Sequence, residues 1–311
     1  MKIFISGSLA YDRIMDFPGK FEDHILPDKI HVLNVSFEVN GLTENFGGTA
    51  GNIAYSLALL GEKPTILAAV GKDFDRYGEW LMQNGIDLSG IARRPDEFTS
   101  GAYITTDLSD NQITGFNPGA MKFPSKYAFD GVDPRNTLAI VSPGNAEDML
   151  VYSRTYKQMG IGFIFDPGQQ IPVLPAEEIA EMIDGSRVLI TNDYELDMIK
   201  KMTGLTIEGL LGRTRAIITT LGEKGSVILD SRGEERIPVV KTDNVVDPTG
   251  AGDAYRSGLI KGMVMGKTLS ESARIGAACA AYAVECYGTQ EHRFTPEEFW
   301  NRYREYFNLI R

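Results

Sequence analysis

The strongest concentration of residues that could do chemistry is the string Asp247-Pro248-Thr249-Gly250-Ala251-Gly252-Asp253-Ala254-Tyr255, which leads into a predicted helix. Gly250 and Gly252 allow the backbone to turn tightly, so that main-chain N–H groups and a helix N-terminus can point at one anion. Asp253 falls in the first helical turn, where its carboxylate would repel a bound phosphate unless it takes part in the reaction. Accepting the proton of an attacking hydroxyl is its natural role. One Gly/Asp turn is more often an ordinary capped turn, but the nine-residue string favours phosphoryl transfer.

A second glycine-rich segment, Gly47-Gly48-Thr49-Ala50-Gly51-Asn52-Ile53-Ala54, precedes another predicted helix. Its glycines permit close backbone approach to a ligand, although a glycine turn with Asn52 as a helix cap explains this segment equally well. Together the two segments are much more specific than either alone. Gly266-Lys267-Thr268 imitates the end of a Walker A loop, but Lys261 stands where its first glycine should be, so any phosphate binding is not of the P-loop kind.

The elements that must position these residues alternate along the chain. Short, continuously apolar runs predict buried strands over 2–6, 65–70, 138–142, 162–166, 187–191 and 216–220, and longer periodic segments predict helices over 52–60, 74–84, 146–159, 194–203, 253–265, 270–285 and 296–307. This alternation predicts an α/β fold with a doubly wound, mainly parallel sheet flanked by helices. Ligands bind at the carboxyl ends of the strands in such sheets, and small and polar residues follow these strands.

Two stretches depart from that pattern. Residues 33–40 alternate strictly between apolar and polar side chains, which predicts a half-exposed strand, and 102–107 with 112–116 read as a hairpin. We therefore expect a single domain over 1–311 with a small β lid, formed by inserted segments at about 10–46 and 99–121. The core of this lid would be thin, so it should move or lean on a partner chain.

Composition excludes several function classes. The 31 Lys and Arg against 42 Asp and Glu give a net charge of −11, which argues against a nucleic-acid or anionic-membrane partner. The two cysteines exclude a disulfide framework and a four-cysteine metal site. The sequence also lacks a signal-peptide pattern and an apolar run long enough to span a membrane, so we expect a soluble cytoplasmic protein.

The two glycine-rich segments closely resemble the two signatures of the ribokinase-like (PfkB) family of carbohydrate and nucleoside kinases. The family's intervening motifs also match in order, at Asn192 with Glu195 and at Thr220, Gly222 and Gly225, and the resemblance covers essentially the whole chain. Within the family the chain looks most like bacterial adenosine kinases of mycobacterial type, through the segments 7–12, 17–21, 36–37, 116–121, 166–170, 191–195 and 288–291. It departs from that pattern at position 102 on the first hairpin strand, where an aromatic residue is expected and this chain has Ala102, with Tyr103 beside it.

The resemblance implies ATP-dependent phosphorylation of the 5′-hydroxyl of adenosine to AMP, a purine-salvage reaction. Asp253 would be the base, and the N–H groups of Gly250, Ala251 and Gly252 would stabilise the γ-phosphoryl group in flight. Asp12, Gly48 and Asn52 would hold the ribose hydroxyls. The candidates for the base and the lid-side wall are Ser8, Ser36, Phe116, Gln169 and Gln170, although Phe116 fits a hairpin core as well and the glutamines fit a solvated loop.

The resemblance also implies where ATP and cations bind. Asn192, Thr220, Gly222 and Gly225 would form the ATP site, although the last three also fit a plain β-hairpin turn. Glu195 and Asn192 would hold Mg²⁺ through water. Asp247 would belong to a monovalent-cation site, with K⁺ as its occupant.

Three alternatives stay open from the sequence. The acceptor could be another nucleoside or a small sugar, or the chain could be a catalytically silent nucleoside-binding regulator. The intact Asp253 and its glycine-rich turn argue against the regulator. The alternating pattern and exposed edges of the lid also predict a homodimer formed through it.

Overall fold

The structure, a computed structural model, describes residues 1–109, 111–242 and 244–308. Its main sheet runs in the order β13-β12-β11-β10-β9-β8-β1-β4-β5. The strands are β1 (Lys2–Ser6), β4 (Thr65–Val70), β5 (Ile91–Arg93), β8 (Thr137–Val141), β9 (Gly162–Phe165), β10 (Val188–Asn192), β11 (Ala216–Thr220), β12 (Ser226–Asp230) and β13 (Gly233–Ile237). All neighbours pair in parallel except β11–β12 and β12–β13. The predicted mainly parallel sheet is confirmed.

Helices cover both faces of this sheet, because successive strand residues point to opposite faces. Ile3 and Ile5 of β1 pack in one apolar cluster, and Phe4 between them packs in the other. The first face carries α1 (Thr49–Leu59), α2 (Asp75–Gln83), α7 (Ala251–Val264), α8 (Leu269–Ala283) and α9 (Pro296–Asn308). The second carries α3 (Ala146–Met159), α4 (Ala176–Ile183), α5 (Asp193–Thr203) and α6 (Ile207–Leu211). No described helix is long and apolar enough to pass through a membrane.

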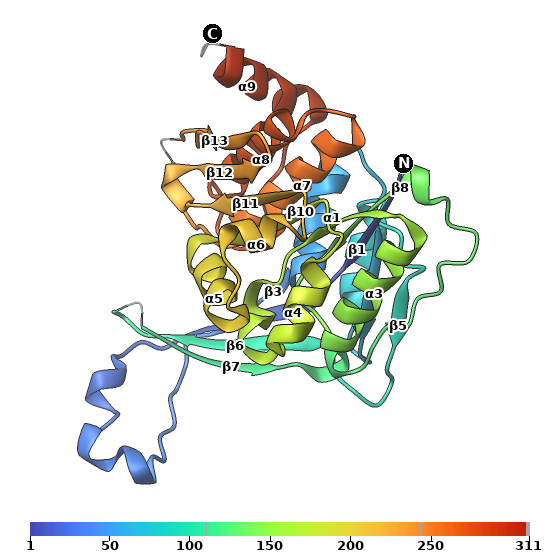
Figure 1. The fold of residues 1–311 in the computed structure, drawn as a ribbon. Coiled ribbons are helices and arrows are strands. Elements are labelled where there is room, and N and C mark those ends of the chain that lie inside the picture. The colour runs from blue at the N-terminus through green and yellow to red at the C-terminus, as the bar shows by residue number, and fades with distance from the viewer. Residues whose placement is uncertain (110, 243, 309–311) are drawn as a thin grey trace.

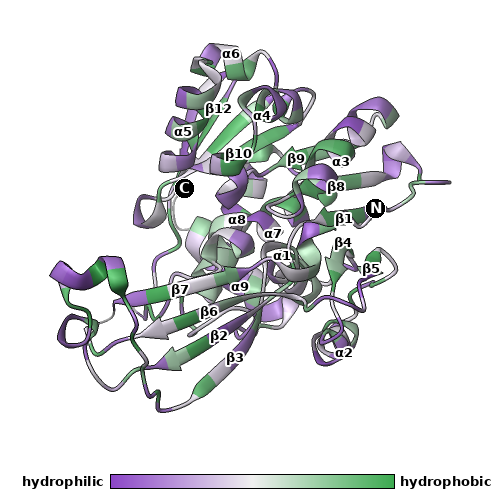
Figure 2. Cartoon of the chain, turned by 90° about the horizontal axis from the view of Figure 1, so that it is seen from below, coloured by the Kyte–Doolittle hydropathy of each residue, from purple (hydrophilic) through white to green (hydrophobic). Residues whose placement is uncertain are grey.

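A separate four-stranded sheet is built from the two inserted segments. Its order is β3-β2-β6-β7, from β2 (Ala10–Asp16), β3 (Leu42–Gly47), β6 (Ser100–Thr106) and β7 (Gln112–Asn117), as Figure 2 shows. We call these four strands the lid sheet. The predicted hairpin is confirmed as the antiparallel pair β6–β7, although Asp110 in its turn lies outside the described residues.

The predicted strand over 33–40 is wrong. These residues form no strand and belong to a lobe, residues 17–41, that projects from one end of the lid sheet (Figure 1) and contains only short 3-10 helices at Phe21–Asp23 and Pro27–Val32. Phe37 packs against Phe17 and Phe21, with ring centroids 4.7 and 5.1 Å apart. Alternation makes a strand only where a neighbour supplies backbone hydrogen bonds, and none of the described strands runs alongside this segment.

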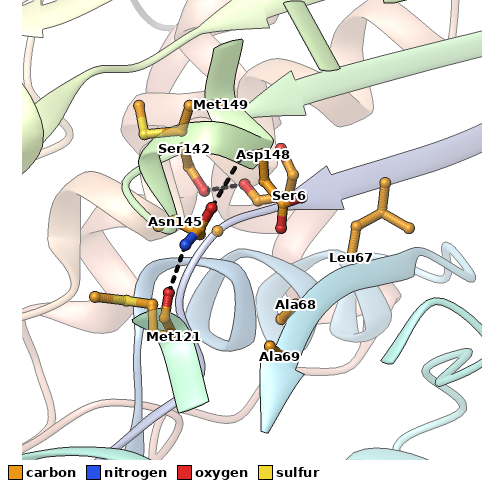
Figure 3. A pocket seen from close by; sticks show the side chains of 11 residues that line it. Ser6, Leu67, Ala68, Ala69, Met121, Ser142, Asn145, Asp148 and Met149 are labelled. Carbon is orange, nitrogen blue, oxygen red and sulfur yellow. Dashed lines mark hydrogen bonds between the residues drawn. The ribbon is translucent and has the colours of Figure 1, made fainter. Parts of the chain in front are cut away.

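Side-chain hydrogen bonds hold the segments at the carboxyl ends of β1 and β8 in place. The Ser142 hydroxyl donates to the Ser6 carbonyl (2.7 Å), and the Asn145 amide donates to the Met121 carbonyl (2.9 Å), as Figure 3 shows. The cavity between them measures about 10 Å³, which is room for about one water molecule. This small cavity therefore belongs to the packed interior at the carboxyl ends of these strands.

Candidate active site

Two cavities meet at the carboxyl edge of the main sheet. One of about 230 Å³ is lined by Asp166, Asn192, Glu195, Thr220 and Arg256, and we call it the donor cavity. The other, of about 460 Å³, is lined by Ser8, Asp12, Gly48, Asn52, Phe116 and Gln170, and we call it the acceptor cavity. Both are lined by Thr49, Pro143, Gln169, Gly250 and Asp253. The two glycine-rich segments thus meet at one junction, with Asp253 between the cavities.

The turn before α7 leaves several main-chain N–H groups free at this junction. Gly250 has a left-handed backbone (φ +77°), which only glycine adopts without strain, and it turns the chain into the helix. Within the described residues the N–H groups of Gly250, Gly252 and Asp253 have no backbone acceptor, whereas Ala251 donates to the Pro248 carbonyl (3.1 Å). Two of the three predicted N–H donors are therefore free. The N–H of Asp253 is a further free donor that the sequence reasoning missed.

Asp253 is held by an amide from the first glycine-rich segment. The Asn52 side-chain N–H donates to Asp253 Oδ2 at 2.8 Å, so the predicted substrate ligand Asn52 contacts the predicted base directly. Burial raises the pKa of Asp253 to about 6, against the lowering effect of Arg256 and the Asn52 hydrogen bond. A carboxylate with a pKa near the working pH suits proton acceptance, because it is ionised yet still basic.

A buried ion pair lies beside Asp253 in the donor cavity. Arg256 binds Asp166 through two guanidinium nitrogens, one of them at 2.6 Å, and a third donates to the Gly252 carbonyl at 3.0 Å. The pair is 7% and 1% exposed. Sequence reasoning gave Arg256 no role, although an arginine three residues after the base, on the same helix, is a signal that could have found it. Because Arg256 also donates to the Gly252 carbonyl, the ion pair holds the first turn of α7 in place.

Asp12, on β2 of the lid sheet, faces the acceptor cavity without a partner. Burial raises its pKa to about 6, and no hydrogen bond from within the described residues offsets that rise. A Cβ added at Gly47 would lie 2.5 Å from Asp12 Oδ2, so the glycine makes room for the carboxylate. An unpaired, half-buried carboxylate can accept hydrogen bonds from hydroxyl groups of a ligand.

Gly48 joins β3 to α1 and lies against the backbone of residues 8–10, which follow β1. It has a left-handed backbone (φ +87°), and a Cβ there would lie 2.6 Å from the Ser8 carbonyl oxygen. The Ser8 hydroxyl accepts from the Thr49 N–H (3.0 Å), and the Thr49 hydroxyl donates to the Pro143 carbonyl (2.9 Å). Ser8 thus holds the start of α1 in addition to lining the acceptor cavity. Thr49, which lines both cavities, is a residue that the sequence reasoning missed.

The lid sheet and the 168–173 turn close the other side of the acceptor cavity. Phe116 on β7 lies opposite the small Ala102 of β6 and reaches the cavity, together with Gln169 and Gln170. Tyr103 is not among the lining residues, and its hydroxyl accepts from Arg13 (3.0 Å). Of the predicted ligands Ser36 lies apart: it is exposed in the projecting lobe and lines neither cavity.

Asn192 and Glu195 begin α5 at the edge of the donor cavity. The Asn192 side chain accepts from the Glu195 N–H (2.7 Å), and Glu195 Oε2 accepts from the Asn192 N–H (2.8 Å). In this reciprocal cap Glu195 Oε1 has no hydrogen-bond partner among the described residues, and burial raises the pKa of Glu195. No cluster of three or more metal-ligating side chains occurs among the described residues. One free carboxylate oxygen in a polar cavity fits Mg²⁺, which keeps most of its waters, better than it fits a cation that needs a full cage of protein ligands.

The predicted nucleotide loop is divided by the structure. Thr220 lines the donor cavity, whereas Gly222 and Gly225 lie outside it, in the turn between the antiparallel strands β11 and β12. A Cβ at Gly225 would lie 2.2 Å from the Ile237 carbonyl oxygen, so this glycine is required by the packing of β13.

Asp247 lines neither cavity. Its carboxylate accepts from the N–H groups of Thr249 and Gly288, each at 2.9 Å. Although partial burial opposes it, these hydrogen bonds hold the pKa of Asp247 below its usual value. The residue ties the glycine-rich turn to the segment after α8.

Comparison with known proteins places the chain in a family. Residues 11–296 match the pfkB family of carbohydrate kinases. A nucleoside kinase of Methanocaldococcus jannaschii is 34% identical over 83% of this chain and 85% of its own. The fold matches a Burkholderia thailandensis nucleoside kinase in complex with inosine (TM-score 0.87, 35% identity, 98% of this chain and 99% of that one). It also matches a solved structure of the M. jannaschii nucleoside kinase, an archaeal member of the ribokinase family (TM-score 0.85, 30% identity, 98% and 99%). The chain has the ribokinase-like fold and belongs to the pfkB family of carbohydrate kinases, phosphotransferases that act on a hydroxyl acceptor.

Proposed function

We propose that the chain is a nucleoside kinase that transfers the γ-phosphoryl group of ATP to the 5′-hydroxyl of a purine nucleoside. The observation that carries this proposal is the junction at Asp253, which lines both the acceptor and the donor cavity. A hydroxyl in one cavity and a phosphoryl group in the other would meet there, beside the free N–H groups of the α7 turn. The nucleoside kinases among the relatives support the choice of acceptor.

The acceptor cavity suits a nucleoside better than a bare sugar. Asp12 would accept hydrogen bonds from the two vicinal ribose hydroxyls, with Gly48 and Asn52 beside it. Phe116 and Gln170 line only the acceptor cavity, Gln169 lines it at the junction, and Phe116 offers an aromatic face on which a nucleobase would stack. A ribose alone would leave much of the roughly 460 Å³ cavity unfilled.

The proton transfer of the reaction depends on the ionised carboxylate of Asp253. Its ionised carboxylate would take the proton of the 5′-hydroxyl as that oxygen bonds to the phosphorus, and ADP would leave on the side of the donor cavity. The N–H groups of Gly250, Gly252 and Asp253 would stabilise the charge on the phosphoryl oxygens. Asn192 and Thr220 would bind ATP, and Glu195 with Asn192 would hold Mg²⁺ through water. When bound, Mg²⁺ would neutralise phosphate charge.

Adenosine is our first choice of substrate, with AMP as product and purine salvage as the context. The B. thailandensis relative was solved with inosine, so a purine with a 6-oxo group is the closest competitor. A ribokinase of Lactococcus lactis, 27% identical, keeps ribose as a second candidate.

An acceptor panel tests the proposal. ADP release from ATP is measured with adenosine, inosine, guanosine, cytidine, ribose and fructose, and the phosphorylated position is read by phosphorus NMR. We expect purine nucleosides to have the highest kcat/KM and to yield 5′-monophosphates. Turnover confined to ribose or fructose would refute the nucleoside assignment.

The lid extends the proposal to a homodimer. The projecting lobe exposes apolar side chains, among them Leu26, Ile30 and Val32 at 56%, 64% and 66%. A second copy would cover such a surface. Light scattering at micromolar concentration should give the mass of a dimer, and a monomeric mass would count against it.

For Asp247 the proposal of a K⁺ site predicts that replacing K⁺ with Na⁺ lowers turnover.

A further inference from the structure

The amide of Asn52 is the last link of a hydrogen-bonded series of side chains that is buried at its centre and ends at Asp253. Trp80 Nε1 on α2 donates to Gln290 Oε1 (3.1 Å), and Gln290 Nε2 donates to Asn52 Oδ1 (3.1 Å). Asn52 Nδ2 then donates to Asp253 Oδ2 (2.8 Å). These three hydrogen bonds connect α2, through Gln290 and α1, to the junction of the two cavities.

The first hydrogen bond, from Trp80, fixes the donor-to-acceptor direction of this series. The indole of Trp80 can only donate, so the Gln290 atom that faces it must be the amide oxygen. The other end of the Gln290 amide is then its NH₂ group, and Asn52 must present its own oxygen to it. This orientation leaves the NH₂ group of Asn52 pointing at Asp253.

Tyr77 fixes the same direction independently. Its hydroxyl donates to the Gly47 carbonyl (2.8 Å), which can only accept, so toward Gln290 it acts as an acceptor. Gln290 Nε2 lies 2.6 Å from that hydroxyl. Both hydrogens of the Gln290 NH₂ group are therefore used, one by Tyr77 and one by Asn52.

Packing around Gln290 holds its backbone in a strained conformation. Gln290 is 2% exposed and has a left-handed backbone (φ +61°), which a non-glycine residue adopts only where its neighbours enforce it. The adjacent Thr289 hydroxyl donates to the Phe46 carbonyl (2.7 Å). A Cβ added at Gly51 would lie 2.0 Å from the Tyr77 hydroxyl and 3.0 Å from Gln290 Nε2, so this glycine makes space for the chain.

We propose that Gln290 is a positioning residue for phosphoryl transfer: it fixes the Asn52 amide so that an N–H, and not a carbonyl oxygen, faces Asp253. The inference rests on the proposed function, in which Asp253 is the base. With Oδ2 engaged by Asn52, the ionised carboxylate is stabilised and Oδ1 stays available to the acceptor hydroxyl. Without Gln290 the Asn52 amide can rotate and set its oxygen against the carboxylate.

Other charged groups also face Asp253 and set the background for a test by pH. Arg256, from the same helix, favours its ionised form, whereas Asp166 after β9 and Asp12 on β2 disfavour it. Tyr77 and Gln290, the residues behind Asn52, remain uncharged across the working range, because burial raises the pKa of Tyr77 well above 10. A change confined to Gln290 therefore acts on Asp253 through Asn52.

The test compares Gln290→Met with Ser56→Ala. Gln290→Met keeps the length and removes both the donor and the acceptor. Ser56→Ala breaks the contact between Ser56 and His292 Nε2 (3.1 Å), in the same interface between α1 and the 288–292 segment but outside the chain to Asp253. For each enzyme the pH profile of kcat/KM, kcat at pH 6.5, the KM for ATP and the melting temperature are measured.

We expect Gln290→Met to move the acid limb of the profile to higher pH by about half a unit or more and to lower kcat at pH 6.5 by about 3- to 30-fold, with the KM for ATP unchanged. Ser56→Ala should lower only the melting temperature. Trp80→Phe, which removes the directing donor but keeps Gln290, should move the limb in the same direction by less, and it serves if Gln290→Met does not fold.

A Gln290→Met enzyme that loses stability but keeps the wild-type profile and kcat would overturn the inference. Failure of the proposed function would look different. In that case the wild-type enzyme would phosphorylate no nucleoside, or Asp253→Asn would match it.

Discussion

Replacing Asp12 by Asn should stabilise the free protein while weakening its binding of nucleoside. Burial raises the pKa of Asp12 from 3.8 to about 6, and no hydrogen bond from the described residues offsets this rise. Such an increase corresponds to a penalty of at most about 3 kcal/mol on the ionised form at neutral pH. The neutral amide of Asn avoids that penalty.

The gain should depend on pH with a definite sign. Between pH 3.8 and about 6 the folded protein keeps the Asp12 proton while the unfolded chain loses it, so the free energy of unfolding falls as pH rises through this range. Above about pH 7 the whole penalty is present. The advantage of Asp12→Asn should therefore be near zero at pH 4 and largest at pH 8.

The assay is chemical denaturation of the ligand-free wild type and of Asp12→Asn at pH 4.5 and pH 8, with the nucleoside KM measured at pH 8. The KM should rise about 10- to 100-fold, because hydrogen bonds to a charged acceptor are worth about 1.5–3 kcal/mol. Asp107→Asn is a control of opposite sign: this carboxylate accepts from the N–H groups of Phe21, Ser109 and Asn111, so its replacement should destabilise the protein at pH 8. An equal effect of Asp12→Asn at both pH values would refute the reasoning.

Two further predictions concern the walls of the cavities. Phe116→Ala should raise the KM for purine nucleosides by roughly 3- to 10-fold, because aromatic stacking is lost, and should leave the KM for ATP unchanged. Tyr103→Ala, on the same hairpin but outside the cavity lining, should change neither KM. Equal effects of the two substitutions would show that the nucleobase does not bind against Phe116. Arg256→Met leaves the Asp166 carboxylate buried without its partner and should lower the free energy of unfolding by about 3–5 kcal/mol, measured by denaturation. Addition of Asp166→Asn should recover part of that loss, and no recovery would contradict the ion-pair account.

Most of the main sheet and its helices could be predicted from sequence, because buried parallel strands are continuously apolar and helices carry a 3.6-residue period. The runs 2–6, 65–70 and 216–220 match β1, β4 and β11 to the residue. The short helices α4 and α6, the edge strands β5 and β13 of the main sheet, and the lid strands β2 and β3 were not predicted. β2 is AYDRIMD and β3 is LTENFG, and neither sequence has a clean alternation or a continuous apolar run.

The site could be predicted where residues adjacent in sequence act together. The Asp247–Tyr255 string locates the α7 turn, and the polar residues after the strands locate the sheet edge. Contacts between segments far apart in sequence could not be predicted in this way. Asp166 and Arg256 lie 90 residues apart and Gln290 and Asn52 lie 238 apart, and nothing in either local pattern announces the partner.

Single-turnover phosphoryl transfer by the wild type and by Asp253→Asn, with ATP and the best nucleoside of the panel, tests the central claim most directly. The substitution keeps the size of the side chain and removes the proton acceptor at the junction of the two cavities. We predict that the rate falls by about 10²- to 10⁴-fold while the nucleoside Kd changes little. A near-normal rate in Asp253→Asn would contradict the account and remove this carboxylate from the reaction.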